Sequence, residues 1–286
     1  METRDFILGT WQQQEWKWMV VVALFFTGIG SGLFLLALTA GFVLGMVVGL
    51  IFVLAGSLFL FLDLTRPQAA WRLIAKPQKS WISRGVVGIS CFAILSFVYI
   101  LSLISKQNGW SSLGAPWVSG PSWMMALGFL AGIAALFVAT YPGSLLGNMR
   151  AISLWNSTYI PALFLSSAML GGFGVLYLLP LDWQGLPWLP FIKNIGLALV
   201  VFELILLLAA LTWLTLPGAT RDSVSRLSQG SLRFQFFIGL MCLGLILLLA
   251  ILGLVSIGVG IVLLYLIEVF LLRYLIIRAA THVSLH

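Results

Sequence analysis

Two acidic residues lie inside long apolar stretches of the sequence, where a charge is costly. Glu203 stands in VFELILLL and Glu268 in YLIEVFLL. An ionisable residue in such a stretch usually marks a proton or substrate pathway, because the membrane interior disfavours charge. The two acids stand at similar depth and could meet as a proton relay. A structural hydrogen bond to a neighbouring helix is an equally open interpretation.

A third acid opens the most distinctive segment of the chain, residues 62–85, with the sequence LDLTRPQAAWRLIAKPQKSWISRG. Asp63 could pair with Arg66 or Arg84 as a clamp at the membrane surface, or take part in proton uptake. The segment then continues as a basic stretch that carries tryptophans. Such a composition is typical of a loop that lies at the membrane surface.

Residues 139–156 form a second unusual segment, ATYPGSLLGNMRAISLWN. Tyr141 places a rigid ring with one hydroxyl at the end of an apolar stretch. Pro142 and Gly143 are expected to break the helix directly after it, because proline has no N–H for the helical hydrogen bond. Backbone groups freed by such a break could line the mouth of a pocket.

Ligands for a redox metal are scarce in this sequence. The two histidines, His282 and His286, stand near the C-terminus, and the two cysteines, Cys91 and Cys242, form no C-x-x-C motif. A membrane haem held by two histidines is therefore not expected, and neither is a thiolate-bound zinc or iron–sulfur cluster. We expect no haem and no metal in this chain.

Membrane helices must position these residues. Hydrophobic residues make up 61% of the 286 residues and charged residues only 8%, against about 25% charged residues in a soluble domain. A membrane span needs about 20 mostly apolar residues. The sequence predicts an all-α integral membrane protein, a single membrane domain of eight transmembrane helices packed as two four-helix bundles. The expected spans are residues 17–39, 41–63, 85–104, 121–141, 157–179, 192–216, 234–251 and 254–277.

The basic residues indicate the orientation of these spans. Eight spans place both termini on one side, and of the fifteen lysines and arginines only Lys106 and Lys193 fall on the other. Arg273, near the end of the last span, counts toward the basic side. The positive-inside rule predicts that the basic side is cytoplasmic. The same face could dock an acidic protein, and no nucleic-acid partner is expected.

Three motifs together resemble the membrane-anchor subunits of the polysulfide reductase family, also called the NrfD/PsrC family. The first is the small-residue run from Thr27 to Gly32. The second is the segment from Asp63 to Gly85, with its acid-x-x-Arg-Pro start and its Ser-Trp-x-Ser-Arg-Gly end. The third is Tyr-x-Gly at Tyr141, followed by Leu-Trp-Asn before the fifth span. The order and spacing match as far as about residue 160, and the rest matches by hydropathy.

The resemblance implies a quinone-interacting membrane-anchor subunit of a respiratory oxidoreductase complex in a bacterial or archaeal cell membrane. Such a subunit passes electrons between the quinone pool, menaquinone or another quinone, and a ferredoxin-like iron–sulfur subunit. That subunit in turn serves a molybdopterin-type catalytic subunit. By itself the chain is not expected to catalyse the reaction of the terminal substrate.

The resemblance also implies positions for the site. The quinone head is expected between the start of the first span and the end of the fourth, where Tyr141 falls on the family's quinone-contacting tyrosine. Some family members carry a histidine in the first span, and Ala23 stands at that position here. The expected quinone-binding residues of the first span are Gln14, Trp18 and Gly28. The expected proton-transfer residues are Asp63, Glu203 and Glu268. The residues expected to dock the partner are Arg66, Arg72, Lys76, Lys79, Arg84 and Arg150.

An alternative function is a proton-coupled secondary transporter with Glu203 and Glu268 as its coupling acids. Transporters of this kind often carry similarly interrupted spans in two halves of the sequence, and no such pair is visible here. A purely structural anchor without a quinone site is a third possibility.

Overall fold

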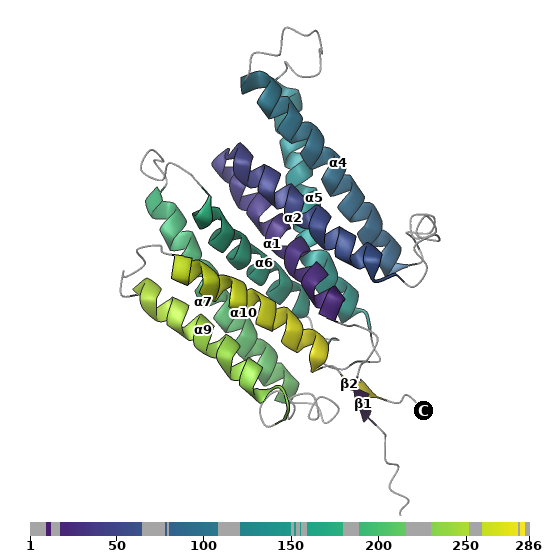
Figure 1. Ribbon diagram of the computed structural model, residues 1–286, viewed down its shortest axis with the longest axis vertical. Helices are drawn as coiled ribbons and strands as arrows, with labels where there is room; N and C mark the ends of the chain where they lie inside the picture. Colours follow the sequence, from purple (N-terminus) through teal and green to yellow (C-terminus); the bar gives the residue numbers. More distant parts are fainter. Residues whose placement is uncertain are drawn as a thin grey trace, which may run out of the picture.

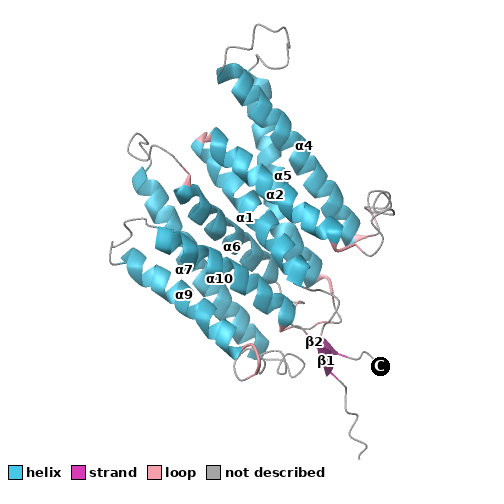
Figure 2. Cartoon of the chain, viewed as in Figure 1, coloured by secondary structure: helices cyan, strands magenta, loops and turns pink. Residues whose placement is uncertain are grey.

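The computed structural model forms an assembly of packed helices (Figure 1). It describes residues 10–12, 18–64, 78, 80–107, 121–149, 152, 155, 159–179, 189–215, 230–251, 259–279 and 281–283. Figure 2 shows that helix is by far the dominant element in these ranges. The helices are α1 (Trp18–Ala40), α2 (Val43–Leu62), α4 (Trp81–Gln107), α5 (Pro121–Gly147), α6 (Tyr159–Leu178), α7 (Leu189–Thr215), α9 (Arg233–Ile251) and α10 (Val259–Arg278), and the strands are β1 (Thr10–Gln12) and β2 (Thr281–Val283).

The predicted all-α fold class is confirmed for the described residues, apart from the two three-residue strands. Each of the eight expected spans overlaps one helix. Five of these helices, α1, α2, α4, α5 and α6, are long and apolar enough to cross a membrane. Three bounds differ clearly from the prediction, because α4 begins at Trp81, α5 continues to Gly147 and α10 begins at Val259.

The predicted helix break at Pro142 and Gly143 is wrong, since both residues lie inside α5. The Thr140 hydroxyl donates to the carbonyl of Leu136 at 2.9 Å. This bond does not replace the one that Pro142 removes, which would go to the Val138 carbonyl, but α5 is nevertheless continuous as far as Gly147. Gly143 serves packing instead, because an added Cβ would lie 2.5 Å from the Cα of Pro161 on α6.

Helices α1 and α6 form the centre of the assembly, and most residues along both are buried. α1 contacts α2, α5, α6 and α10, and α6 contacts α5, α7 and α10. Small residues allow the two backbones to approach closely. A Cβ on Gly32 would overlap the Ala168 carbonyl, and a Cβ on Gly172 would overlap the backbone of Leu33. Lipid supplies no hydrophobic drive for helix association, so this close packing is what holds the pair together.

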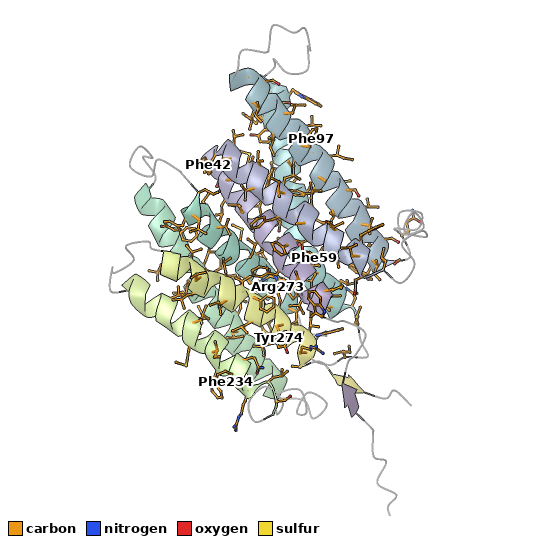
Figure 3. The ribbon with its side chains drawn as sticks, in the orientation of Figure 1. Phe42, Phe59, Phe97, Phe234, Arg273 and Tyr274 are labelled. Atoms are coloured by element: carbon orange, nitrogen blue, oxygen red, sulfur yellow. The ribbon has the colours of Figure 1, made fainter. Side chains whose placement is uncertain are left out.

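The outer helix faces are apolar. Met125, Phe129, Phe234 and Met241 are among the large hydrophobic side chains that are highly exposed in the isolated protein. Figure 3 shows side chains of this type, Phe97 and Phe234 among them, on the outside of the assembly. A surface of this kind is far too apolar to face water. It suits the hydrocarbon interior of a bilayer.

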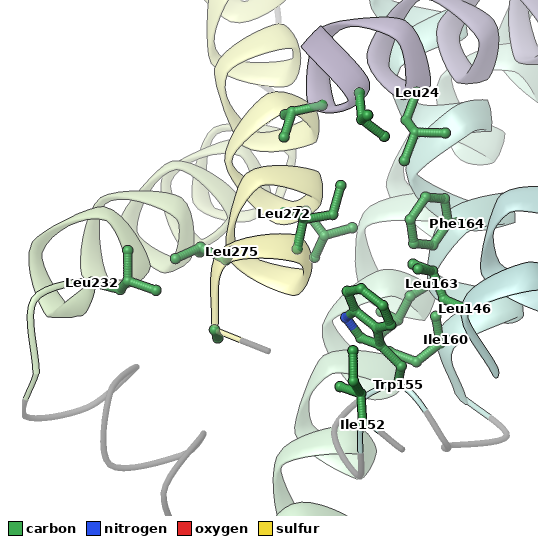
Figure 4. Packing of buried hydrophobic residues seen from close by; sticks show 14 residues of the cluster. Leu24, Leu146, Ile152, Trp155, Ile160, Leu163, Phe164, Leu232, Leu272 and Leu275 are labelled. Atoms are coloured by element: carbon green, nitrogen blue, oxygen red, sulfur yellow. The ribbon is translucent and has the colours of Figure 1, made fainter. Parts of the chain in front are cut away.

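Two contacts tie together segments that are far apart in the sequence. β1 pairs antiparallel with β2, with Trp11 opposite His282, so the two terminal segments lie side by side (Figure 1). The buried Trp155 indole N–H donates to the carbonyl of Ile276 at 2.8 Å. Figure 4 shows Trp155 packed among Ile152, Ile160 and other residues of one buried cluster. Trp155 is thereby fixed to the end of α10.

We predict that Gly32→Ala destabilises the protein by about 1–3 kcal/mol, the usual cost of overpacking. The added methyl group would overlap a backbone carbonyl of α6, which can move only if the whole helix shifts. The measurement is the thermal unfolding midpoint of the purified protein in detergent. Gly239→Ala is the matched control, because its Cβ would lie 3.7 Å from the nearest side chain, Leu271. Equal midpoints for the two variants would contradict the tight α1–α6 contact.

Candidate functional site: a buried charged cluster and a tyrosine at a helix interface

Three ionisable side chains meet in the interior of the assembly. Glu203 of α7, Glu268 of α10 and Arg273 of α10 are buried, with 0%, 4% and 0% of their surface exposed. Each of the two acids interacts electrostatically with Arg273, and the acids also interact with each other. The structure therefore brings together the two acids that the sequence singled out, around a cation that it did not.

Arg273 is held by backbone groups of two helices. Its Nε donates to the Leu24 carbonyl of α1 at 3.1 Å, and its Nη1 donates to the Val269 carbonyl of its own helix at 3.1 Å. The guanidinium also lies 5.5 Å from the centre of the Phe164 ring of α6. Figure 3 shows Arg273 in the interior of the assembly, where α10 passes α1. These contacts fix the cation at the junction of three helices.

Arg273, which the sequence counts toward the basic side, does not lie on the protein surface. Its side chain lies wholly inside the assembly, where two backbone carbonyls accept its hydrogen bonds and two carboxyls interact with it electrostatically. Gly28 of α1 makes room for it, since a Cβ there would overlap Nη2 of the guanidinium. Gly28 thus contacts the charged cluster in the structure.

Several polar atoms of the cluster have no hydrogen-bond partner among the described residues. They are both carboxyl oxygens of Glu203, Oε2 of Glu268 and Nη2 of Arg273. Ser166 of α6 lies near Glu203, but its hydroxyl donates to the Leu163 carbonyl at 3.2 Å. An unpaired buried polar atom costs about 1–3 kcal/mol. These unpaired atoms mark a candidate functional site, and a structural hydrogen bond remains the other interpretation of the two acids.

Tyr141 lies at a different helix interface. Its hydroxyl donates to the Trp81 carbonyl at the start of α4, at 2.8 Å. The ring packs against Gly85, where a Cβ would overlap it, and stacks on Phe137 with the ring centres 5.5 Å apart. Tyr141 is half-buried, so part of the ring is open to a ligand. It joins the end of α5 to the start of α4.

The expected first-span residues of the site are spread out. Trp18 is the first residue of α1 and is 56% exposed, whereas Gly28 is buried against Arg273. Gln14 lies outside the described residues. Tyr141 and Gly28 therefore belong to different helix interfaces, α4–α5 and α1–α10. Ala23, at the position of the family histidine, is fully buried and its carbonyl accepts a bond from the hydroxyl of Thr27.

Two of the expected surface residues are described. Arg84 is exposed near the start of α4, where its Nη2 donates to the Gln78 carbonyl at 3.1 Å and its guanidinium lies 4.6 Å from the centre of the Trp81 ring. Asp63 caps the end of α2 and is half-buried. The other expected docking residues, Arg66, Arg72, Lys76, Lys79 and Arg150, lie outside the described residues.

Sequence reasoning missed Arg273, although a signal was present. An arginine only five positions after Glu268, inside an apolar stretch, is too deep to count as a surface charge. Trp155 is expected from the sequence as an interfacial tryptophan and as part of a family motif, and in the structure its indole N–H bonds to α10. Within the described ranges no group of three histidine, cysteine, aspartate or glutamate side chains could hold a metal ion.

Similarity to known proteins extends over nearly the whole sequence. Residues 8–284 match the family described as "Polysulphide reductase, NrfD". The C subunit of polysulfide reductase from Wolinella succinogenes is 25% identical over 255 residues, which are 80% of this protein and 80% of the relative. "Protein NrfD" of Escherichia coli is 27% identical over 268 residues, which are 81% of this protein and 82% of the relative. The protein therefore belongs to the NrfD polysulphide reductase family and is a multi-pass membrane protein.

Proposed function

We propose that this protein is the membrane-anchor, quinone-interacting subunit of a respiratory oxidoreductase complex in a bacterial or archaeal cell membrane. It exchanges electrons between menaquinone, or another quinone, and a ferredoxin-like iron–sulfur subunit that serves a molybdopterin-type catalytic subunit. The observation that carries this proposal is the family match over residues 8–284. The relatives, which are named as a polysulfide reductase component and as NrfD, support a place in a reductase complex.

All eight helices cross the membrane in this proposal, as two four-helix bundles. In support, α1, α2, α4 and α5 contact one another in a closed order, and so do α6, α7, α9 and α10. The pairing of β1 with β2 also requires both terminal segments on one side, as an even number of crossings gives. The basic excess on that side favours the cytoplasm.

The quinone site is proposed at Tyr141, with Trp18 and Gln14 at the start of the first helix. A quinone head needs one or two hydrogen-bonding groups in an apolar pocket. The Tyr141 hydroxyl donates to the Trp81 carbonyl and its oxygen interacts with the backbone N–H of Gly85, so a quinol hydroxyl would bond to the second lone pair of that oxygen. The stacked Phe137 ring supplies an apolar wall beside it. Gly28, which the family resemblance also implies for this site, lies against Arg273 at the α1–α10 interface.

The iron–sulfur partner is proposed to dock on the basic face that includes Arg84. A cluster must come close to the quinone for electron transfer, and Arg84 lies one position from Gly85, which touches Tyr141. Charge complementarity would steer an acidic protein to this face. The remaining proposed docking residues are Arg66, Arg72, Lys76, Lys79 and Arg150.

Quinone chemistry moves protons together with electrons, so the site needs a proton supply. We assign proton transfer to Asp63, at the membrane surface, and to Glu203 and Glu268 in the interior. The buried pair is also the observation that favours the alternative, a proton-coupled secondary transporter. The experiments below separate the two functions.

Tyr141→Phe is expected to lower quinol-coupled turnover about tenfold, the effect of losing roughly 1.4 kcal/mol at the quinone. Assembly of the complex should be unchanged, because a single neutral hydrogen bond is worth only about 0.5–1.5 kcal/mol. Tyr99→Phe, on α4 and also half-buried, is the matched control and should keep full activity. Full quinol activity in both Tyr141→Phe and Tyr141→Ala would rule out this quinone site.

Purification from native membranes separates an anchor from a transporter. The tagged protein is expected to bring down an iron–sulfur subunit and a molybdopterin-containing subunit, identified by mass spectrometry and metal content. A protein that purifies alone while it moves a solute would support the transporter. A complex that assembles but resists quinone-analogue inhibitors would indicate a purely structural anchor.

The double variant Glu203→Gln and Glu268→Gln is expected to reduce proton movement during turnover. Glutamine keeps the size and polarity of the side chain but cannot take up a proton at neutral pH. The measurement is the membrane potential and internal pH of proteoliposomes that hold the complex. Unchanged turnover and unchanged potential would leave the two acids with a structural role.

A further inference from the structure

We infer that Glu203, Glu268 and Arg273 form one proton-storing site in the membrane interior, in which the two carboxyls share a single exchangeable proton beside buried water. Arg273 is the positioning residue of this site, since it keeps one carboxyl ionised. The inference deepens the proposed proton-transfer role and rests on it for the use of the stored proton. The number of protons in the site follows from the charges and positions of the three residues and does not depend on that role.

The first step of the argument is a count of charge. A guanidinium stays protonated in proteins, so Arg273 contributes one positive charge. Two ionised carboxylates beside it would leave one negative charge without compensation, and two neutral carboxyls would leave the cation alone. Either state leaves a net charge inside a membrane protein, which is strongly disfavoured. One ionised and one protonated carboxyl give a neutral cluster.

The surroundings of the cluster offer no other charge among the described residues that face it. α1 presents the Leu24 carbonyl and Gly28, and α6 presents the Phe164 ring and Ser166. α9 presents the Cys242 thiol toward Glu268. None of these groups carries a fixed charge, so the balance must be met by the three residues themselves.

The second step concerns the unpaired atoms. Four polar atoms of the cluster lack a hydrogen-bond partner within the part of the protein that the structure describes: both oxygens of Glu203, Oε2 of Glu268 and Nη2 of Arg273. Buried water typically makes about three hydrogen bonds to groups of this kind. Water among these atoms would satisfy them and would also carry a proton from one carboxyl to the other.

The third step concerns the place of Arg273 between the two acids. Its Nε and Nη1 are held by the backbone of α1 and α10, whereas its Nη2 has no partner in the described ranges. The cation is therefore fixed while the proton is free to reside on either carboxyl. Glu203 belongs to α7 and Glu268 to α10, so a shift of the proton moves charge from one helix to another without moving the arginine.

The test counts protonated carboxyls by infrared spectroscopy of the full-length protein in lipid nanodiscs, with the carboxyl carbons of glutamate labelled with carbon-13. A protonated carboxyl gives a C=O band that shifts on exchange into deuterium oxide. We expect a band from one buried glutamic acid at neutral pH. Glu203→Gln and Glu268→Gln should each abolish it, because the remaining carboxyl then pairs with Arg273 as a carboxylate. Arg273→Gln should double it.

Cys242→Ala is the matched control, since it removes a neighbour of Glu268 that has no fixed charge, and it should keep the single band. A wild-type protein with no buried protonated glutamic acid would overturn the inference. So would a full band that survives in both single glutamine variants. These two variants are close in size to the native residues and decide the question even if Arg273→Gln fails to fold.

The spectroscopic count needs no quinone and no partner subunit, so it is independent of enzymatic activity. If the infrared bands are as expected but proton movement is unchanged in the double glutamine variant, the storage site is established and the proposed proton-transfer role is rejected. If proton movement is altered in the double variant but the expected bands are missing, the storage site is rejected and the proton-transfer role is supported. Loss of activity in the Tyr141 variants affects neither result.

Discussion

The burial of one arginine constrains four helices of this protein. A buried guanidinium needs acceptors for its N–H groups and a negative charge to compensate its own. Each neighbour of Arg273 supplies an acceptor, a charge or the space for the side chain. α1 provides the Leu24 carbonyl and leaves space at Gly28, α6 provides the Phe164 ring, and α7 and α10 provide the carboxyls. Removal of either carboxyl would change the charge balance of the cluster, and loss of the space at Gly28 would displace the guanidinium, so the four helices depend on one another at this point.

The close approach of α1 to α6 makes this cluster possible. Apolar burial cannot drive helices together in lipid, and the two helices instead meet through glycine and alanine at backbone distance. Gly32 against Ala168 and Gly172 against Leu33 bring the helices close along their length. The same run of small residues in α1 therefore serves two purposes, packing at Gly32 and space for a cation at Gly28. The quinone site proposed at Tyr141 lies on a different interface, so the two sites are separate parts of one assembly.

Hydropathy predicted the positions of the helices well, because about 20 apolar residues are an unmistakable signal. Local rules failed where a tertiary contact outweighs them. Pro142 and Gly143 suggest a break, yet α5 continues to Gly147, and Gly143 fits closely against α6. Arg273 was counted as a surface charge because its partners, Leu24 and Glu203, lie far away in the sequence. The family motifs indicated Tyr141, but not that its hydroxyl bonds the start of α4.

The pairing of β1 with β2 has a consequence for membrane insertion. Strand pairing needs both segments in the same compartment, and the sequence between them holds all eight described helices. If all eight helices cross the membrane, as we propose, a single helix that failed to insert would invert every later one and leave the strands separated by a hydrocarbon layer of about 30 Å. The β1–β2 sheet can form only when every helix inserts, or when the number of helices that fail to insert is even. The sheet therefore forms only in molecules in which the number of membrane crossings between the two strands is even.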